Sequence, residues 1–146
     1  MTHKWQNWAR TATASPTEVI AASDPQQLAE VVRRAATDGR TVRMIGSGHS
    51  FTPTAVANDI QLTPGRLTKI RNVDVEAGRI TVEAGIDLTT LCKVLDSNGL
   101  ALSNMGDVRV QTLAGALQTG THGTGKATGT FADMVVGLEL VLGDGS

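Results

Sequence analysis

The sequence predicts a ligand-binding domain of mixed helices and strands, in the α/β or α+β class. Hydrophobic residues make up 40% of the 146 residues, which is enough for one domain with a real core. Segments with helical periodicity alternate with strand-like runs. Of the 16 glycines, many gather in two clusters that apolar residues flank, which is not typical of flexible linkers.

Composition and charge exclude several classes of protein. The 13 basic and 14 acidic residues give a net charge of −1, so neither nucleic acid nor an anionic membrane is an expected partner. No apolar run is long enough to span a bilayer, and the first residues do not resemble a secretory signal. The single Cys92 excludes an internal disulfide and a cysteine zinc site, which favours the cytoplasm.

The first half of the chain predicts a β-α-β unit. Residues 18–21 form a strand-like run, and Ser23 or Asp24 caps a helix that Gly39 ends. A strand is then expected over 41–45, and it leads directly into the first glycine cluster. Apolar residues at helical spacing mark the buried side of the helix: Leu28, Val31, Val32, Ala35 and Ala36.

The second half predicts strands at 59–62 and 67–70, a hairpin of 73–76 with 79–83, and a strand at 134–142. Between the hairpin and the last strand, Asp87 caps a second helix, which Gly99 ends and whose buried face carries Cys92. The final residues, 143–146, are typical of a hairpin turn whose second strand would follow. The chain is therefore expected to be part of a longer protein.

Two glycine motifs fail as nucleotide fingerprints. The pair Gly46 and Gly48 follows a strand, but Phe51 stands where a Rossmann fingerprint has its third glycine, and no acidic residue follows about 20 positions later. Residues 120–126 match the first seven positions of a P-loop, but Ala127 replaces the Ser or Thr that holds magnesium. The three histidines lack the spacing of metal ligands, so no metal is expected.

A two-loop anion cradle remains. Backbone N–H groups from Gly46 to Ser50 can form a concave nest for a pyrophosphate, assisted by the hydroxyls of Ser47 and Ser50. The second cluster, 106–123, offers small residues against which a flat ring can lie. Glycine loops that merely turn the chain are about as common, so both interpretations stay open from the pattern alone.

The stretch "RMIGSGHSFT" resembles the first FAD-binding loop of vanillyl-alcohol-oxidase-type flavoproteins, whose FAD-binding domain is of the PCMH type. It is most similar to the branch of gulonolactone, galactonolactone and arabinonolactone oxidases or dehydrogenases and of alditol oxidases. Three more stretches agree in order and spacing: "WQNWA", "LSNMGDVRVQTLAGALQTGTHGTG" and "VVGLELVLGDGS".

The resemblance implies an α+β FAD-binding domain of two subdomains. It implies an N-terminal segment over 1–15, a first subdomain over 16–102, and the beginning of a second over 103–146. The C-terminal substrate domain of the family is absent from this chain, so the residues that act on substrate remain unknown.

The resemblance also implies the cofactor contacts. His49 would bond covalently to the flavin 8α-methyl, or hold FAD by hydrogen bonding only. Asp107 stands where relatives often have Ser. The expected FAD contacts are Met44, Ile45, Gly46, Ser47, Gly48, His49, Ser50, Phe51, Gly106, Asp107, Thr112, Gly115, Ala116, Thr119 and His122.

The expected activity is oxidation of a sugar-derived alcohol or aldonolactone by hydride transfer to flavin N5, with O₂ or another acceptor reoxidising the flavin. Two alternatives stay open. The chain as given is a flavin- or nucleotide-binding module without catalysis of its own, or it belongs to a related flavoprotein that oxidises phenols or hydroxy acids.

Overall fold

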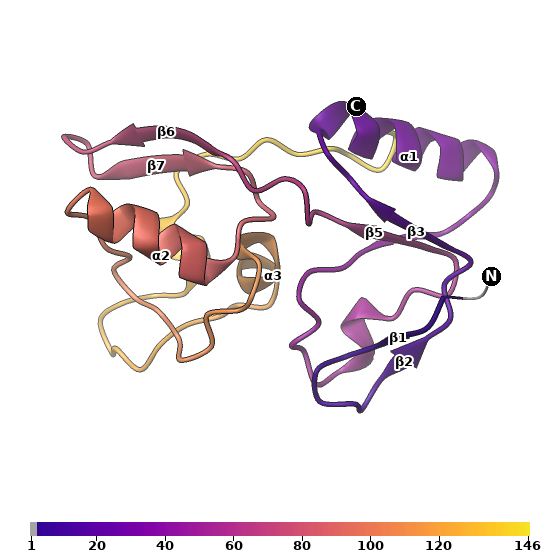
Figure 1. The fold of residues 1–146 in the computed structure, drawn as a ribbon, viewed down its shortest axis with the longest axis horizontal. Coiled ribbons are helices and arrows are strands. Elements are labelled where there is room, and N and C mark those ends of the chain that lie inside the picture. Colours follow the sequence, from indigo (N-terminus) through magenta and orange to yellow (C-terminus); the bar gives the residue numbers. More distant parts are fainter. Residues whose placement is uncertain (1–2) are drawn as a thin grey trace. The chain divides into compact units, whose positions relative to one another are not determined.

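The computed structural model describes residues 3–146 and shows the α+β fold that the sequence predicts (Figure 1). Packing divides the described residues into two compact units. Unit 1 contains residues 3–67 and Glu139–Ser146, and unit 2 contains Thr68–Leu138. Residues 1 and 2 of the predicted N-terminal segment lie outside the described residues. The predicted subdomain boundary between residues 102 and 103 stays a prediction.

Unit 1 is built on a three-stranded parallel sheet. Strands β3 (Glu18–Ala21), β5 (Ile60–Thr63) and β4 (Val42–Met44) pair in the order β3-β5-β4. Helix α1 (Pro25–Thr37) connects β3 to β4, which confirms the predicted β-α-β unit. The strand β5 comes later in the chain and lies between the other two, so their contact is through β5 alone.

Helix α1 begins and ends where the sequence predicts. The Asp24 carboxylate accepts the N–H of Gln27 at 2.8 Å, and Pro25 occupies the first turn, where its missing N–H costs nothing. Gly39 follows the helix with φ of +64°, a conformation that few other residues adopt. The apolar face of α1 packs on the sheet. The buried residues of this core are Ala22, Val31, Ala35, Ile60, Leu62 and Leu67.

A cluster of ion pairs joins the strands of this sheet to the end of α1. Arg40 lies 2.6 Å from Asp59 and 2.7 Å from Glu18, and Glu18 also pairs with Arg34 at 2.6 Å. Asp59 also accepts the backbone N–H of Thr41 at 2.9 Å. The Arg40 guanidinium is the main reason that the pKa of Asp59 and the pKa of Glu18 lie below their usual values.

This cluster predicts an acid-sensitive contribution to stability. Because the folded state lowers the pKa of Asp59, its stabilisation is present above the unfolded pKa of about 3.9 and is lost as the pH falls through the lower, folded value. The difference in free energy of unfolding between the wild type and Asp59→Asn should therefore be larger at pH 7 than at pH 3. Urea denaturation at both pH values measures it. Asp96→Asn is the control, because within residues 3–146 the Asp96 carboxylate has no ion pair. An Asp59→Asn difference that does not change with pH would contradict this role.

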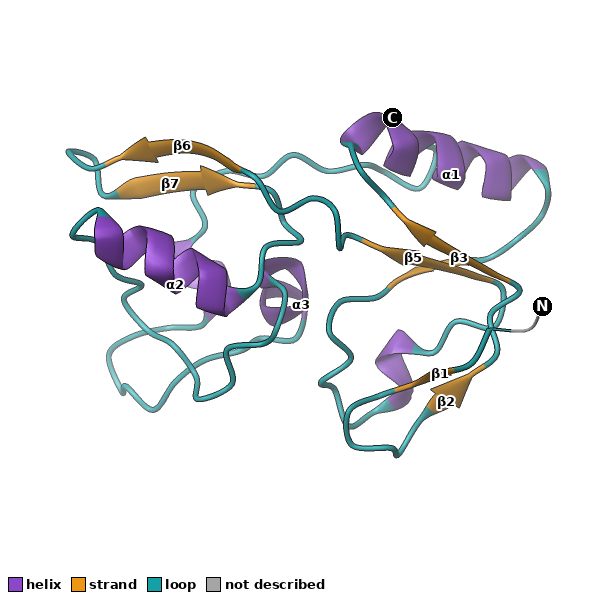
Figure 2. Cartoon of the chain, viewed as in Figure 1, coloured by secondary structure: helices purple, strands orange, loops and turns teal. Residues whose placement is uncertain are grey.

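Unit 1 also contains the short hairpin of β1 (Trp5–Gln6) and β2 (Thr13–Ala14) and the 3₁₀ turn η1 (Pro53–Ala55). Figure 2 shows these elements among the loops of the unit. At the other end of the chain, the predicted turn over 143–146 forms, with the N–H of Leu142 donating to the carbonyl of Ser146 at 2.9 Å. Arg33 of α1 donates to the Gly145 carbonyl at 3.0 Å, which fixes this turn to the helix.

Unit 2 combines an antiparallel hairpin with two helices. Its elements are β6 (Ile70–Asp74), β7 (Arg79–Val82), α2 (Leu88–Ser97), α3 (Leu113–Gln118) and the 3₁₀ turn η2 (Phe131–Met134). Asp87 caps α2 by accepting the N–H of Thr90 at 2.9 Å, as the sequence predicts. The buried core consists of Ile86, Leu88, Leu91, Leu95, Ala116 and Phe131. Cys92 is half-buried on α2, and its Sγ lies 3.2 Å from Met105 Sδ.

Two strand predictions are wrong. Residues 67–69 form no strand, because Leu67 ends a turn by donating to the Pro64 carbonyl at 2.8 Å and places its side chain in the core of unit 1; only Ile70 of the predicted segment is in a strand, as the first residue of β6. Residues 134–142 form no strand either, because no strand of the described residues pairs with them. The alternating side chains of that segment stay exposed: Val136, Leu138, Leu140 and Leu142. The predicted hairpin forms, but its first strand begins earlier, at Ile70, and ends at Asp74.

Neither a membrane-spanning helix nor a cluster of metal-ligand side chains occurs within residues 3–146. No helix there is both long enough and apolar enough to cross a bilayer. The same residues contain no group of three or more His, Cys, Asp or Glu side chains placed to hold a metal ion.

Candidate functional site: a glycine loop held by the N-terminal segment

The first predicted loop leaves the sheet at the end of β4. Ile45 anchors it, because its side chain is buried and its N–H donates to the Leu62 carbonyl of β5 at 2.8 Å. Met44, one residue earlier, keeps a largely exposed side chain at the edge of the sheet. The parallel sheet therefore delivers residues 46–51 as a loop beyond the carboxyl end of a strand, where ligands bind in many open sheets.

Four backbone N–H groups of this loop have no acceptor among residues 3–146. This holds for Gly46, Gly48, His49 and Ser50. Gly48 has φ of +68°, and a positive φ beside a negative one can turn consecutive N–H groups toward one concave side. Unpaired donors at this density need water or an anion as partner. The loop thus offers the donors of an anion nest, as the sequence predicts.

The N-terminal segment holds the loop from behind. The N–H of Trp8 donates to the Gly48 carbonyl at 2.9 Å, and Asn7 Nδ2 donates to the Ser50 carbonyl at 2.9 Å. The Thr11 hydroxyl donates to the Phe51 carbonyl at 2.8 Å. Asn7 is buried, and its Oδ1 accepts the N–H of Ala12 at 3.0 Å. These bonds use the carbonyl groups of the loop and leave its N–H groups available to a ligand.

Sequence reasoning missed this role of the N-terminal segment. The stretch "WQNWA" that resembles the family includes Trp5 and Trp8, but the resemblance implied no contact for either. The available signal was the combination itself, because two tryptophans around an asparagine are unusual in a segment with no other large apolar residue. The residues that this segment contacts lie some 40 positions further along the chain, so a local sequence pattern cannot predict the contacts.

Gly48 is required at its position for two physical reasons. Its φ is positive, and a Cβ placed there would lie 3.2 Å from Cζ2 of the Trp5 indole. We expect Gly48→Ala to cost about 1–2 kcal/mol in backbone conformation and to weaken binding of an anionic ligand at the loop. Urea denaturation and a ligand titration measure the two effects.

Gly78→Ala is the matched control for that substitution. Gly78 has φ of +62° at the tip of the β6–β7 hairpin, and a Cβ there meets nothing within 4 Å. It should lose similar stability and keep wild-type ligand affinity. Equal affinities of the two variants would show that the Gly48 loop does not contribute to binding.

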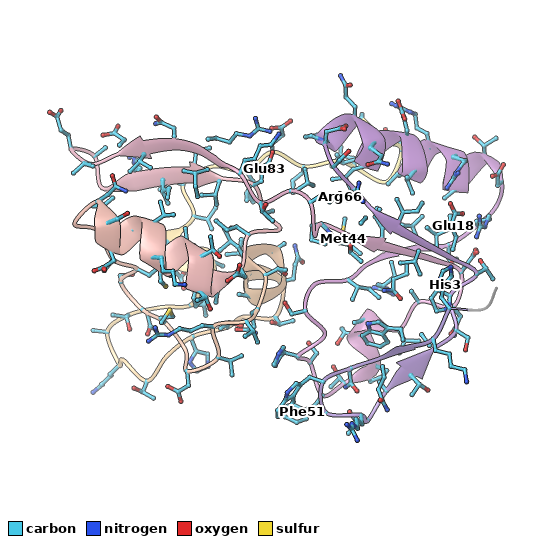
Figure 3. The ribbon with its side chains drawn as sticks, in the orientation of Figure 1. His3, Glu18, Met44, Phe51, Arg66 and Glu83 are labelled. Carbon is cyan, nitrogen blue, oxygen red and sulfur yellow. The ribbon has the colours of Figure 1, made fainter. Side chains whose placement is uncertain are left out.

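Three aromatic rings gather beside the nest. The Trp8 and His49 rings are stacked, with centroids 5.4 Å apart and planes at 17°. Trp8 also meets Phe51 edge-on, with centroids 6.2 Å apart. Trp8 is 65% exposed and Phe51 is 69% exposed, so neither ring is part of the core. Figure 3 shows Phe51 in its loop near the β1–β2 hairpin.

The second predicted segment lies in unit 2 and surrounds α3. Thr112 caps the helix, its hydroxyl accepting the N–H of Gly115 at 3.2 Å. Ala116 is fully buried, and the Thr119 hydroxyl donates to the Gly115 carbonyl at 2.9 Å. Ala116 therefore has a core role in this structure, whereas Thr112 and Thr119 fix the two ends of the short helix.

Gly106 and His122 approach each other closely in unit 2. A Cβ at Gly106 would lie 3.1 Å from the His122 carbonyl oxygen, so a side chain there would press against backbone. The His122 ring is held by its own loop, with Nδ1 2.7 Å from the Gly123 carbonyl oxygen. Asp107 is exposed beside them.

The predicted contacts thus form two sets, one on each unit. Met44–Phe51 make a continuous loop in unit 1, and the predicted residues from Gly106 to His122 surround α3 in unit 2. A hollow of about 450 Å³ between β3 and α1 contains no residue of either set; it is lined by Glu18, Ile20, Gln27, Glu30, Val31 and Arg34. Its open shape and acidic rim do not suit an anionic cofactor.

The fold is of the α+β class, and the loop donors without an acceptor in residues 3–146 are of the kind that a negatively charged cofactor group needs. Comparison with known families narrows this class: the model of the FAD binding domain family matches residues 16–146, and the chain belongs to that family.

Several relatives of this chain are named as lactone oxidases or dehydrogenases. The chain is 38% identical to L-gulonolactone oxidase of Mus musculus over 143 residues, which is 98% of this chain and 32% of the relative. It is 36% identical to L-gulono-1,4-lactone dehydrogenase of Mycobacterium tuberculosis over 97% of this chain and 33% of the relative. It is 33% identical to D-arabinono-1,4-lactone oxidase of Eremothecium gossypii over 97% of this chain and 27% of the relative. The chain therefore spans about a third of the length of these relatives.

A solved structure agrees in fold. A solvent-stable cholesterol oxidase superposes with a TM-score of 0.73 at 24% identity, over 84% of this chain and 24% of that chain. At this identity the likeness shows the shared fold.

Proposed function

We propose that this chain is the FAD-binding portion of a flavin-dependent oxidoreductase that oxidises a sugar-derived alcohol or an aldonolactone. Its relatives named for gulonolactone and arabinonolactone align over nearly the whole chain, and they support this substrate class. The observation that carries the proposal is the set of N–H groups of Gly46, Gly48, His49 and Ser50, which have no acceptor within residues 3–146. Such a nest suits the negative charge of a pyrophosphate.

The residues present fit this cofactor on structural grounds. Gly48 has no Cβ and lies close to the Trp5 indole, and the backbone N–H of Trp8 holds its carbonyl in place. The carbonyls of Gly48, Ser50 and Phe51 already accept hydrogen bonds from Trp8, Asn7 and Thr11, whereas the N–H groups of Gly48 and Ser50 have no acceptor within residues 3–146. Residues 106–122 of unit 2 are proposed to supply the remaining contacts. Among them, Thr112 and Thr119 lie at the two ends of α3, and Gly115 lies within it.

FAD is further proposed to be tethered through a ring nitrogen of His49. A neutral imidazole is a competent nucleophile near pH 7. The tether exchanges one C–H bond of the 8α-methyl group and the imidazole N–H for a C–N bond. The two hydrogens, with two electrons, would pass to the flavin, and O₂ would take them up as hydrogen peroxide. A permanent bond prevents loss of the cofactor.

When bound, FAD supplies hydride acceptance at N5, and the protein supplies binding, orientation and electrostatics. The loop donors hold the negatively charged arm, and His49 fixes the dimethylbenzene end of the ring. Side chains that act on the substrate alcohol are proposed to lie outside this chain. O₂ or another acceptor would reoxidise the cofactor.

Two experiments test the proposal. The purified chain is mixed with FAD and passed through a desalting column, and flavin absorbance that stays with the protein supports binding. A chain that retains no flavin would refute it. Turnover of gulono-, galactono- and arabinonolactone by the parent gene product, against xylitol, lactate and phenols, then tests the substrate class.

A second candidate is that the chain as given binds FAD without turnover. The share of the relatives' length that it spans, about a third, favours this candidate. Retained flavin that is not reduced by any of the lactones would support it, whereas bleaching of the flavin under anaerobic lactone would exclude it.

A further inference from the structure

We propose that Trp8 is a positioning residue for His49, holding the imidazole in the orientation from which it forms its bond to flavin. This inference rests on the histidyl tether proposed above. It concerns a residue outside the glycine loop, and the whole arrangement lies within unit 1.

The Trp8 stack is the interaction that orients the His49 ring. The two rings are nearly parallel at 17°, with centroids 5.4 Å apart, a geometry typical of offset stacking. Within residues 3–146, neither ring nitrogen of His49 has a hydrogen-bond partner. By contrast, the ring of His122 is held by the Gly123 carbonyl. The His49 nitrogens are therefore available, while the plane of the ring is set by the indole.

The indole is itself held in place relative to the loop. The backbone N–H of Trp8 donates to the Gly48 carbonyl, one residue before His49. The two rings therefore extend from backbone segments that are bonded to each other. Asn7 ties the same segment to the Ser50 carbonyl from a buried position. Phe51 meets the indole edge-on and limits its rotation on the far side. The stack is thus held by two hydrogen bonds of the N-terminal segment to the loop and by the contact between the Trp8 and Phe51 rings.

The exposure of Trp8 separates this role from folding. The side chain is 65% exposed, so truncating it removes little core packing. Removing it does free the imidazole to occupy other rotamers, because no hydrogen bond within residues 3–146 would retain the ring. Misorientation of a nucleophile lowers its reaction rate even when the cofactor still binds.

The test compares Trp8→Ala and Trp8→Phe with the wild type and with Val75→Ala. Val75 is an exposed apolar residue at the β6–β7 hairpin, so its truncation controls for loss of surface area in unit 2. The first readout is the NMR signal of the His49 ring protons in the absence of FAD, assigned with His49→Ala; the signals of His3 and His122 are internal references. The second is the rate at which acid-stable flavin appears, compared with the amount of FAD bound before acid treatment.

We expect Trp8→Ala to move the His49 signals downfield, because the indole ring current is lost, and to leave those of His3 and His122 in place. We expect its rate of tethering to fall by at least about tenfold with FAD affinity unchanged, since a small misplacement of reacting groups is costly in rate. Trp8→Phe, which can still stack, should recover to within about threefold of the wild type. Val75→Ala should match the wild type in both readouts.

Trp8→Ala that tethers flavin at the wild-type rate would overturn the positioning role while leaving the proposed function intact. Unmoved His49 signals in Trp8→Ala would overturn it as well. If the wild type itself yields no acid-stable flavin, the tether fails and this inference fails with it; the NMR signals then report whether the stack exists without that function.

Discussion

His49→Ala is expected to leave all of the bound flavin releasable by acid. The reason is chemical, since alanine offers no nitrogen for the bond to the 8α-methyl group, while the loop N–H groups that hold the pyrophosphate belong to the backbone and remain. FAD should therefore still bind, but it should appear in the supernatant after precipitation, whereas wild-type flavin should stay with the pellet. Absorbance of the two fractions measures the effect.

His3→Ala is the matched histidine control, because His3 is exposed outside the glycine loop. It should retain tethered flavin as the wild type does. Acid-stable flavin in the His49→Ala variant would refute the assignment of His49. Release of flavin from both the wild type and the variant would instead show that the loop binds FAD without a covalent bond.

Phe131→Ala is expected to cause the largest loss of stability. Phe131 is 2% exposed and packs in the core of unit 2 with Ala116 and Ile86. Removing a buried phenylalanine side chain typically costs about 3–5 kcal/mol, because the transfer energy is lost and a cavity remains. That is a large fraction of the 5–15 kcal/mol by which domains are usually stable. The midpoint of urea denaturation measures the change.

Phe131→Ala should also disturb the second segment of the proposed site, residues 106–122. The backbone N–H of Phe131 donates to the Thr121 carbonyl at 2.9 Å; alanine keeps this bond, so a shift of residue 131 toward the vacated space would move the loop that contains His122. Val136→Ala is the control, because Val136 is 76% exposed and its truncation should change stability by less than about 0.5 kcal/mol. Equal midpoints for the two variants would show that the core of unit 2 does not depend on Phe131.

The sequence by itself determined helices α1 and α2 and the β6–β7 hairpin, whereas the short helix α3 was not predicted. Asp24 and Asp87 cap α1 and α2, and Gly39 and Gly99 follow them with positive φ, as their positions in the sequence predict. These signals are local, because a cap contacts residues three positions away and a hairpin is closed by its own turn. The loop from Gly46 to Ser50 could be recognised for the same reason.

The tertiary structure alone decided which distant segments meet. No local pattern places β5 between β3 and β4, or leaves residues 134–142 without a strand partner. Nor does any local pattern bring Trp8 onto His49 and Asn7 onto Ser50, since these contacts join residues about 40 positions apart. Strand pairing and ring stacking depend on which surfaces the folded backbone brings together. The position of the glycine loop could thus be predicted from the sequence, whereas the side chains that hold it became visible only in the fold.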